Sequence, residues 1–381
     1  MRQVWAEVNL QTLKENFIKL QAYTRSEMMP IVKADAYGHG VIPVVKTLQA
    51  CGVKRFGVAL LQEALEVKAE FPELTVMVIG ATELDQLDAL VKAEIIPAIF
   101  HLSQAQALSE AAVKQNKTVR LHIKVDTGMN RIGFKEQDLA EIIKISALPN
   151  LFIEGIFTHF ATADIRDLSF AREQLNRFQD CYDNLKTAGL TIPIRHAANS
   201  AAIIQFPESH FELVRPGISL YGLTPSVQIG GNVGLEPVMS WKAKVSHVQS
   251  IKTGETVSYG RTFQAAYPSR IATIPVGYAD GLRRALSNQG EMIVQGTRSM
   301  MVGRVCMDQT MLEVTKIQGV QVGDVVTILG KDGHDQITAT EMAEWLGTIS
   351  YEVVCGISKR VPRVYLNDTE ETTVPESSTQ L

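Results

Sequence analysis

Short apolar runs that alternate with helix-length segments constrain the fold of this chain most. Eight strand-length apolar runs follow one another between residues 28 and 214, and segments of mixed polar and apolar residues separate most of them. Strands that alternate with helices in this way form parallel sheets. Eight such units close into a (β/α)8 barrel, whose active site lies at the carboxyl ends of the strands. The predicted strands span residues 28–33, 55–60, 75–79, 95–100, 118–125, 151–159, 193–197 and 211–214.

An open, doubly wound α/β sheet is the alternative to the closed barrel. Sheets of that kind that bind dinucleotides carry a glycine-rich fingerprint after their first strand. No such fingerprint follows residues 28–33, and the barrel is therefore the favoured fold.

A change of pattern after about residue 235 indicates a second domain, because short strands separated by turn residues replace the alternation. We expect the barrel over residues 9–235 and a mainly β domain over residues 236–366. The strands expected in this second domain span residues 239–246, 270–275, 291–294, 311–314 and 323–329, and one helix spans 340–346 with Thr338 or Thr340 as its cap.

The two ends of the chain differ from both domains. Residues 4–8 alternate like a short strand, we expect the segment 1–8 to pack on the C-terminal domain, and Asn9 can cap the helix that follows. Residues 367–381 are rich in Glu, Thr, Ser and Pro, a composition that predicts a disordered tail.

Composition and charge limit the kinds of partner. The chain has 381 residues with 37 basic and 41 acidic side chains and a net charge of -4, so it has no basic stripe for nucleic acid. A small molecule is the expected partner. No apolar run is long enough to cross a membrane, and the start does not resemble a signal peptide. Four cysteines lie far apart without metal-ligand spacing, which indicates reduced thiols in a cytoplasmic protein without a metal site.

A single lysine, Lys33, closes the first predicted barrel strand. It lies in the sequence Val-Lys-Ala-Asp-Ala-Tyr-Gly-His-Gly at residues 32–40. An amine at the carboxyl end of a barrel strand can form a Schiff base or act as a base. The alternative is a lysine that only extends to solvent at the barrel rim.

Polar side chains also follow other predicted strands. Lys124, His159, His196 and Arg215 stand at or near the ends of four of them, and these ends meet at one mouth if the barrel forms. Taken singly, His159 could be an ordinary core histidine and Arg215 part of a surface ion pair. Their convergence favours a functional site.

A phosphate-binding site is predicted at the same mouth. Barrels often bind phosphate between the loops after strands seven and eight, where Ser200 and the amides of Gly217 and Ile218 stand. Ser200 could alternatively be only a helix cap. A strand-end lysine together with a phosphate site suggests pyridoxal phosphate as cofactor, which supplies an aldehyde for Lys33 and a phosphate for the site.

The sequence around Lys33 resembles the cofactor-lysine motif of alanine racemases, and the similarity extends to about residue 366. The other motifs of that family that occur here in the same order span residues 124–131, 158–164, 196–200, 215–218, 257–261, 277–281 and 306–308. The resemblance implies a fold of a pyridoxal-phosphate-binding barrel followed by a β-rich domain. It also implies a head-to-tail homodimer in which each active site takes residues from both subunits.

The resemblance implies that the enzyme interconverts L-alanine and D-alanine by a two-base mechanism on a pyridoxal-phosphate aldimine, which supplies D-alanine for bacterial cell-wall peptidoglycan. Lys33, which holds the cofactor in a Schiff base, is the base on one face, and Tyr259 of the other subunit is the base on the opposite face. His196 and Arg215 are expected to stabilise the phenolate, with His196 between the phenol and the guanidinium. Arg215 cannot accept a proton and disfavours a protonated pyridine nitrogen beside it, which favours racemisation over transamination.

The resemblance assigns the remaining site residues to the substrate and the cofactor. Arg131 and the Met307 amide of the partner are expected to bind the substrate carboxylate, and Lys124, which is carbamylated in related enzymes, to orient Arg131. The predicted phosphate ligands are Tyr37, Ser200, Gly217, Ile218 and Tyr351, with His159 packed against the ring. The predicted channel residues that admit only a small side chain are Tyr278, Asp164, Arg284 and Arg304.

Two other functions are alternatives to racemisation. A related barrel decarboxylase for a basic amino acid would need an acid at the pyridine nitrogen, and Arg215 argues against that class. A non-catalytic pyridoxal-phosphate carrier would consist of the barrel alone, and would have no use for Tyr259 or for the domain that contains it.

Overall fold

The computed structural model describes residues 3–226, 228–229 and 233–367. Except for Asn367, the tail predicted over 367–381 lies outside the described residues. The chain divides into two compact units, one formed by Lys14–Glu236 and the other by Met1–Leu13 together with Pro237–Leu381.

Parallel strands form the centre of the first unit. Six of them pair in sequence order, and two more, β2 and β9, pair with each other. These strands are β2 (Glu27–Met28), β3 (Arg55–Val58), β4 (Thr75–Val78), β5 (Ile96–Ile99), β6 (Val119–Lys124), β7 (Leu151–Phe157), β8 (Ile194–His196) and β9 (Leu213–Val214).

Contacts on either side of the β2–β9 pair close this sheet. Ile31 forms a parallel bridge with Gly57, and the Arg215 amide donates to the Ala198 carbonyl at 2.9 Å. The (β/α)8 barrel predicted from the alternation is therefore confirmed. The first strand is shorter than its predicted range of 28–33, because the chain leaves strand conformation before Lys33.

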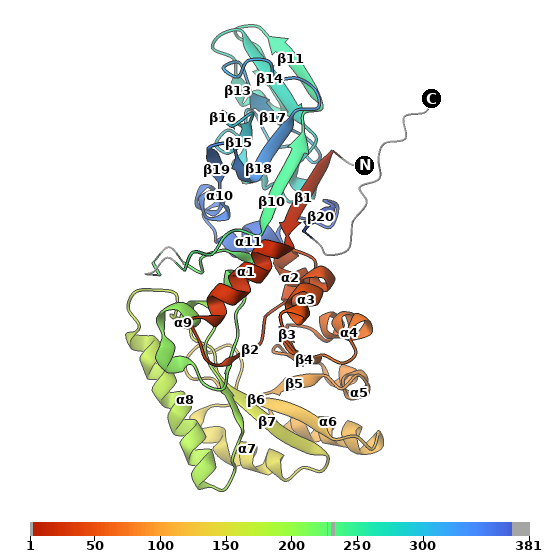
Figure 1. Cartoon of the computed structure of the whole chain (residues 1–381), viewed down its shortest axis with the longest axis vertical. Coiled ribbons are helices and arrows are strands. Elements are labelled where there is room, and N and C mark those ends of the chain that lie inside the picture. Colours follow the sequence, from red (N-terminus) through yellow and green to blue (C-terminus); the bar gives the residue numbers. More distant parts are fainter. Residues whose placement is uncertain (1–2, 227, 230–232, 368–381) are drawn as a thin grey trace. The chain divides into compact units, whose positions relative to one another are not determined.

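Helices cover the outside of this barrel (Figure 1). They are α1 (Leu10–Gln21), α3 (Val41–Ala50), α4 (Leu61–Glu70), α5 (Leu87–Lys92), α6 (Leu102–Lys114), α7 (Leu139–Ser146), α8 (Ser169–Thr187) and α9 (Ser200–Gln205). The start of α1 is capped as expected, since Asn9 Oδ1 accepts from the Thr12 amide at 3.1 Å. Each helix places apolar residues inward, such as Leu108 of α6 and Phe178 of α8, which are fully buried.

The second unit is mainly β, as predicted. Its largest sheet has the order β16-β15-β18-β10-β1-β20 with β19 on β18, and a smaller sheet has the order β11-β14-β17. The strands are β1 (Val4–Asn9), β10 (Met239–Lys244), β11 (His247–Ile251), β14 (Ser269–Ile274), β15 (Glu291–Val294), β16 (Thr297–Met300), β17 (Thr310–Glu313), β18 (Val325–Asp332), β19 (Asp335–Ile337) and β20 (Arg363–Leu366), with the short pair β12 (Thr256–Val257) and β13 (Phe263–Gln264).

The N-terminal strand β1 belongs to the sheet of this second unit. It pairs antiparallel with β10 and parallel with β20. The predicted helix is α10 (Ala339–Leu346), and Thr338 caps it by accepting from the Glu341 amide at 3.0 Å. Sequence analysis did not predict the short helix α11 (Ser350–Cys355), which is less than two turns long.

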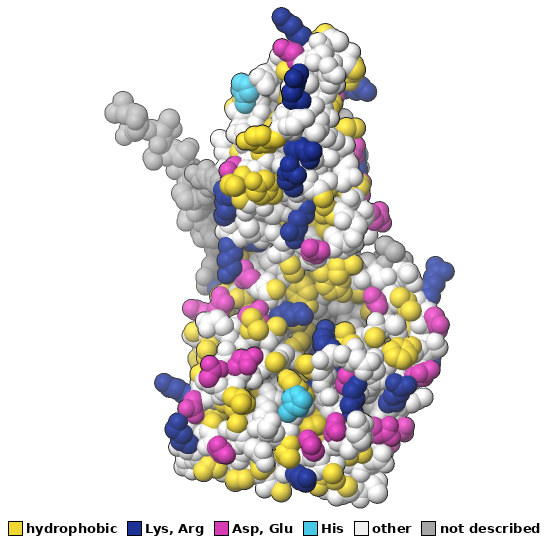
Figure 2. Space-filling model, turned by 180° about the vertical axis from the view of Figure 1, so that it is seen from behind, with side chains coloured by type: hydrophobic (Ala, Val, Ile, Leu, Met, Phe, Trp, Pro, Cys, Tyr) yellow, Lys and Arg dark blue, Asp and Glu magenta, His cyan; other side chains and the backbone are white. Residues whose placement is uncertain are grey.

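Charged side chains of both signs are interspersed over the barrel unit on the face that Figure 2 shows, without a stripe of one sign. Across the described ranges, no helix combines the length and apolar character that a membrane span requires. The four cysteines all lie in the described part of the chain, and none of them is in a disulfide bond.

Candidate active site

Lys33 lies on an unusual left-handed turn at the end of the first barrel strand. The turn is labelled α2 (Lys33–Gly38), and the φ angles of its residues Ala34 to Tyr37 are 52° to 55°. A left-handed conformation costs an L-residue other than glycine roughly 1–2 kcal/mol. Strain of this kind persists where surrounding contacts enforce it, and it is concentrated at functional sites. The residues that follow Lys33 thus form an ordered turn.

Glu63 on α4 holds this turn in place. One of its carboxylate oxygens accepts from the Ala34 amide at 2.6 Å, and the other accepts from the Ala59 and Leu60 amides at 2.8 and 3.1 Å. Asp35 Oδ1 accepts from the Val41 amide at 2.8 Å. The backbone that carries Lys33 is therefore tied to the loop after β3 and to the start of α3.

Arg215, just after β9, has a buried guanidinium with fixed partners. Its Nη1 donates to His196 Nδ1 at 2.9 Å, and its Nη2 donates to the carbonyls of Thr158 and Ala197 at 2.8 and 3.0 Å. Nη2 also lies 3.2 Å from His159 Nδ1. Burial lowers the pKa of Arg215 to about 9. No carboxylate is among the hydrogen-bond partners named above. The predicted neighbours His196 and Arg215 do meet.

The predicted role of His196 as the link to an incoming phenol stays a prediction, and the position of its ring does not favour it. The ring is fully buried, and its Nε2 lies 2.7 Å from His122 Nδ1, while Arg215 occupies its Nδ1. Both ring nitrogens are thus engaged within the barrel. His159, in contrast, is partly exposed and also contacts Arg215.

Tyr37, Ser200 and Gly217 form a cradle at the predicted phosphate site. A Cβ atom at Gly217 would lie 2.8 Å from the Tyr37 hydroxyl and 3.7 Å from Ser200 Oγ, so only glycine leaves this space open. The Gly217 amide donates to Ser200 Oγ at 2.8 Å. Because the serine oxygen accepts here, its own hydrogen remains for an anion in the cradle.

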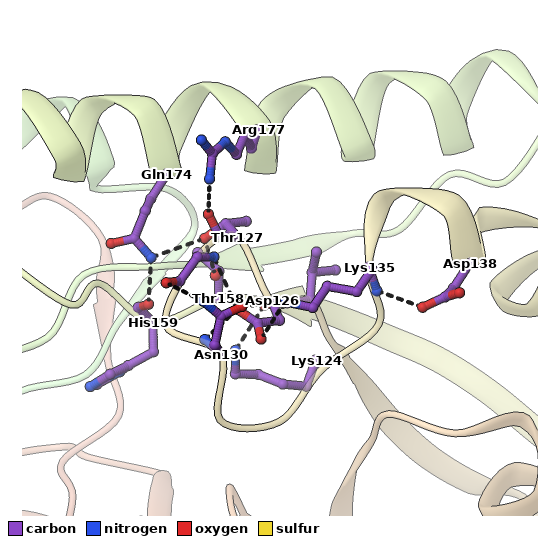
Figure 3. A network of polar contacts seen from close by, with 12 residues as sticks. Lys124, Asp126, Thr127, Asn130, Lys135, Asp138, Thr158, His159, Gln174 and Arg177 are labelled. Atoms are coloured by element: carbon purple, nitrogen blue, oxygen red, sulfur yellow. Dashed lines mark hydrogen bonds and ion pairs between the residues drawn. The ribbon is translucent and has the colours of Figure 1, made fainter.

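A polar network organises the loop after β6 (Figure 3). Asp126 Oδ1 accepts from the amides of Gly128 and Asn130 at 2.9 and 3.0 Å, and its Oδ2 pairs with Lys135 Nζ at 2.9 Å. Gln174 of α8 donates to Thr127 Oγ1 and to the His159 carbonyl at 3.3 and 3.2 Å. The loop that precedes Arg131 is therefore held by the bonds of Asp126 and by Gln174 of α8.

Several cations act on one another at this mouth. Burial, followed by the charge of Arg215, lowers the pKa of Lys124 to about 7. The pKa of His159 lies well below its ordinary value, because of burial and then the nearby charges of Arg215, Arg131, Lys124 and Lys33. The excess of positive charge suits an anionic ligand, such as a phosphate or carboxylate.

Arg131, Asp164 and Ile218 also lie in the barrel unit, and further predicted site residues lie in the second unit. Tyr259, Met307 and Tyr278 are 73%, 53% and 43% exposed on loops that contact one another. Ser258 Oγ donates to the Arg304 carbonyl at 2.7 Å, and the Ala279 amide donates to the Met307 carbonyl at 3.0 Å. The remaining predicted residues of this unit are Arg284, which is exposed, and Tyr351 on α11, which is partly buried.

Family models match nearly the whole chain. The model described as alanine racemase, N-terminal domain, matches residues 8–225, and the one described as alanine racemase, C-terminal domain, matches residues 238–365. The chain belongs to the alanine racemase family. Enzymes of this family are isomerases, so the prediction of an isomerase is confirmed.

Individual relatives agree with the family models. Alanine racemase 1 of Clostridium acetobutylicum is 45% identical over 97% of this chain and 97% of its own length. The alanine racemase of Methanococcus maripaludis is 43% identical over 96% and 99%. The solved alanine racemase of Clostridium difficile has a TM-score of 0.92 at 36% identity, covering 97% of each chain. That of Bacillus anthracis with bound L-Ala-P has a TM-score of 0.91 at 34% identity, covering 97% of this chain and 96% of its own.

Sequence analysis missed three residues that support the site, namely Glu63, His122 and Glu154. His122 stands two residues before Lys124 on the same strand, so both side chains point to the same side of the sheet. Alternation along β6 could have placed His122 in the barrel interior. No comparable signal marks Glu63 or Glu154 as partners of site residues.

Proposed function

We propose that this chain interconverts L-alanine and D-alanine with pyridoxal phosphate bound at the barrel mouth. The observation that carries the proposal is the fixed Arg215 guanidinium in the same mouth as Lys33 and the glycine-lined cradle. A strand-end amine, a cradle for phosphate and a cation in place of an acid match this reaction class.

The residues present fit pyridoxal phosphate. The space that a Cβ at Gly217 would fill, and the Ser200 hydroxyl beside it, suit a phosphate group. Lys33 would hold the cofactor covalently through its amine, and His159 would pack against the ring. The phosphate would be bound by Tyr37, Ser200, Gly217, Ile218 and Tyr351. When bound, the cofactor withdraws electrons from the attached amino acid and so makes its α-hydrogen acidic.

Two bases on opposite faces would exchange the α-proton. The Lys33 amine, freed when substrate binds, would serve one face. Tyr259 would serve the other face from a second copy of the chain, since its side chain is 73% exposed on a loop fixed through Ser258. We infer a head-to-tail homodimer on this basis. A tyrosine with an ordinary pKa near 10 needs neighbours that stabilise its phenolate.

His159 is better placed than His196 to assist that phenolate. It is partly exposed at the mouth and contacts Arg215, whereas both nitrogens of His196 are engaged inside the barrel. We assign the contact with the phenol to His159 and keep His196 as a support of Arg215.

Arg215 would favour racemisation over transamination. Its guanidinium donates hydrogen bonds and remains cationic, so it disfavours a proton on a nitrogen beside it. Less charge is then drawn into the ring, and return of the proton to the α-carbon is favoured. Removing this cation should therefore change the reaction as well as its rate.

Charge and access would select the substrate. Arg131 and the Met307 amide of a partner subunit would bind its carboxylate, with Lys124 behind Arg131. Tyr278, Asp164, Arg284 and Arg304 would narrow the entrance and limit the side chain to a small one. Cysteines without disulfide bonds among the described residues fit the cytoplasmic location that the sequence predicts, where D-alanine would be made for the cell wall.

The test combines absorbance and proton exchange. Lys33→Ala should abolish the visible absorbance of bound cofactor, with Lys54→Ala, an exposed lysine, as control. Tyr259→Phe should slow α-proton removal from one alanine enantiomer far more than from the other, whereas Tyr267→Phe should not. Equal losses for both enantiomers would contradict the two-base assignment, and retained absorbance after dialysis of Lys33→Ala would overturn the cofactor assignment.

The shared site has its own test. Lys33→Ala and Tyr259→Phe subunits should be mixed and allowed to exchange, since a head-to-tail heterodimer would contain one complete site. Some activity should return. No recovered activity after confirmed exchange would argue against a site built from two subunits.

A further inference from the structure

A continuous line of hydrogen-bonded side chains runs from Arg215 into the barrel interior. Arg215 Nη1 contacts His196 Nδ1 at 2.9 Å, and His196 Nε2 contacts His122 Nδ1 at 2.7 Å. His122 Nε2 then contacts Glu154 Oε2 at 3.0 Å. Neither the catalytic bases nor the cradle include His122 or Glu154.

The chemistry of the two ends fixes the direction of every hydrogen bond in this line. Arg215 can only donate, so His196 must accept at Nδ1 and carry its hydrogen on Nε2. That hydrogen points to His122 Nδ1, which must accept. His122 then carries its hydrogen on Nε2 and donates it to Glu154, whose ionised carboxylate can only accept.

Burial keeps both histidines neutral in this arrangement. His122 and His196 are fully buried, and the Phe157 ring stacks on His196 with centroids 4.7 Å apart. Burial lowers the pKa of each histidine. Each ring therefore has one donor and one acceptor, and each is used once.

Glu154 is held ionised at the far end of the line. Its carboxylate accepts from Arg55 Nη1 and Arg120 Nη1 at 2.8 and 2.9 Å, in addition to His122. Burial alone would raise its pKa, but the hydrogen bonds from His122 and Arg55 lower it. The acceptor that orients His122 is thus always present at neutral pH.

Reversal of the line would disturb Arg215. If His122 donated to His196, then His196 would carry its hydrogen on Nδ1, directly against the N–H of Arg215. Two donors would then face each other in a buried site, which is costly. Glu154 excludes this state because it can only accept from His122.

We infer that Glu154 and His122 are positioning residues of the reaction, which hold His196 as the acceptor that keeps the Arg215 guanidinium in place at the mouth. The inference rests on the role of Arg215 in the proposed function. The alternative is that Glu154 only neutralises Arg55 and Arg120 within the barrel.

The first test reads the two rings directly, without cofactor. The full chain, freed of cofactor and labelled with nitrogen-15 in its eight histidines, should be measured by long-range nitrogen–proton NMR, with His122→Phe and His196→Phe to assign signals. At neutral pH both rings should be neutral with hydrogen on Nε2. A ring protonated on Nδ1, or on both nitrogens, would overturn the inference whatever the activity of the enzyme.

The second test uses Glu154→Gln. His122 and Arg55 both contact Oε2 and Arg120 contacts Oε1, so glutamine can place its single carbonyl oxygen at only one of these positions, and in one of the two orientations its NH2 group faces His122. A population with hydrogen on His196 Nδ1 should appear, and the racemisation rate should fall roughly tenfold in both directions, a loss typical of outer supporting residues.

Two further variants separate positioning from charge neutralisation. Arg120→Met removes one ion pair of Glu154 but leaves its contact with His122, so protein stability should fall while the His196 tautomer and the rate stay near wild type. Glu212→Gln, at the exposed pair with Arg195, should change neither the tautomer nor the rate. Equal rate losses in Glu154→Gln and Arg120→Met, with an unchanged tautomer in both, would refute the positioning role. If the unmutated protein shows the expected histidine tautomers but has no racemase activity, the proposed function is refuted and the inferred hydrogen-bond directions are not.

Discussion

Gly217→Ala should weaken cofactor binding because of a single contact. The added Cβ would lie 2.8 Å from the Tyr37 hydroxyl, whereas ordinary contacts begin at 3.4 Å. Either Tyr37 or the backbone after β9 must shift by about 0.6 Å, and both belong to the proposed phosphate cradle. Overpacking of this kind costs about 1–3 kcal/mol. If the cost falls on the bound state, affinity for pyridoxal phosphate should drop roughly 5- to 150-fold.

The assay is a titration of cofactor-free protein with pyridoxal phosphate, followed by absorbance, together with urea unfolding of the same samples. A double-mutant cycle isolates the contact. In a Tyr37→Phe background the hydroxyl is gone and the nearest remaining ring atom lies 3.5 Å from the Cβ, so Gly217→Ala should cost much less there.

Gly189→Ala is the matched control. Gly189 has a φ of 90° and no atom within 4 Å of an added Cβ, so alanine should lower the unfolding free energy without changing cofactor affinity. An equal loss of affinity for Gly217→Ala in both backgrounds would refute the reasoning.

Three further predictions concern side chains of the barrel unit. Glu63→Gln replaces one of two accepting oxygens by a donor, so it should lower the unfolding free energy by about 1–2 kcal/mol and reduce activity. Glu66→Gln, on the exposed side of α4, should do neither, and denaturation together with a racemase assay checks both variants. The pKa of Glu154 is lower in the folded than in the unfolded protein, so the stabilisation from its ionised carboxylate is fully present above about pH 4.3 and is lost as the pH falls through the folded pKa. The unfolding free energy, measured by denaturation, should therefore decrease on acidification below about pH 4.3. Glu154→Gln should make this decrease smaller. Burial raises the pKa of the Cys181 thiol to about 12, so at pH 8 it should resist a thiol reagent in the native protein and react after unfolding. Mass spectrometry of labelled peptides checks this, and labelling of Cys181 in the native protein would contradict the prediction.

Local periodicity in the sequence was enough to predict most of the fold. Alternation of apolar runs with helix-length segments predicted the parallel barrel, and its strands lie within or close to the predicted ranges. The predicted cap Asn9 is confirmed, and Thr338 is the one of the two predicted candidates that caps α10, because a cap depends on residues only a few positions apart. The motifs around Lys33, Arg215 and Tyr259 predicted the family.

Contacts between distant segments decided the rest. The left-handed turn at Ala34–Tyr37 is made of residues that do not favour it, and it depends on Glu63 from helix α4. The neighbours of His196 depend on the register of β6, β7 and β8, which places His122 beside His196 and Glu154 beside His122. No local pattern specifies that register, because it is set by how all the strands pack when the barrel closes. The sequence alone therefore determined which residues stand at the mouth, and only the tertiary structure determined which of them can still reach a ligand.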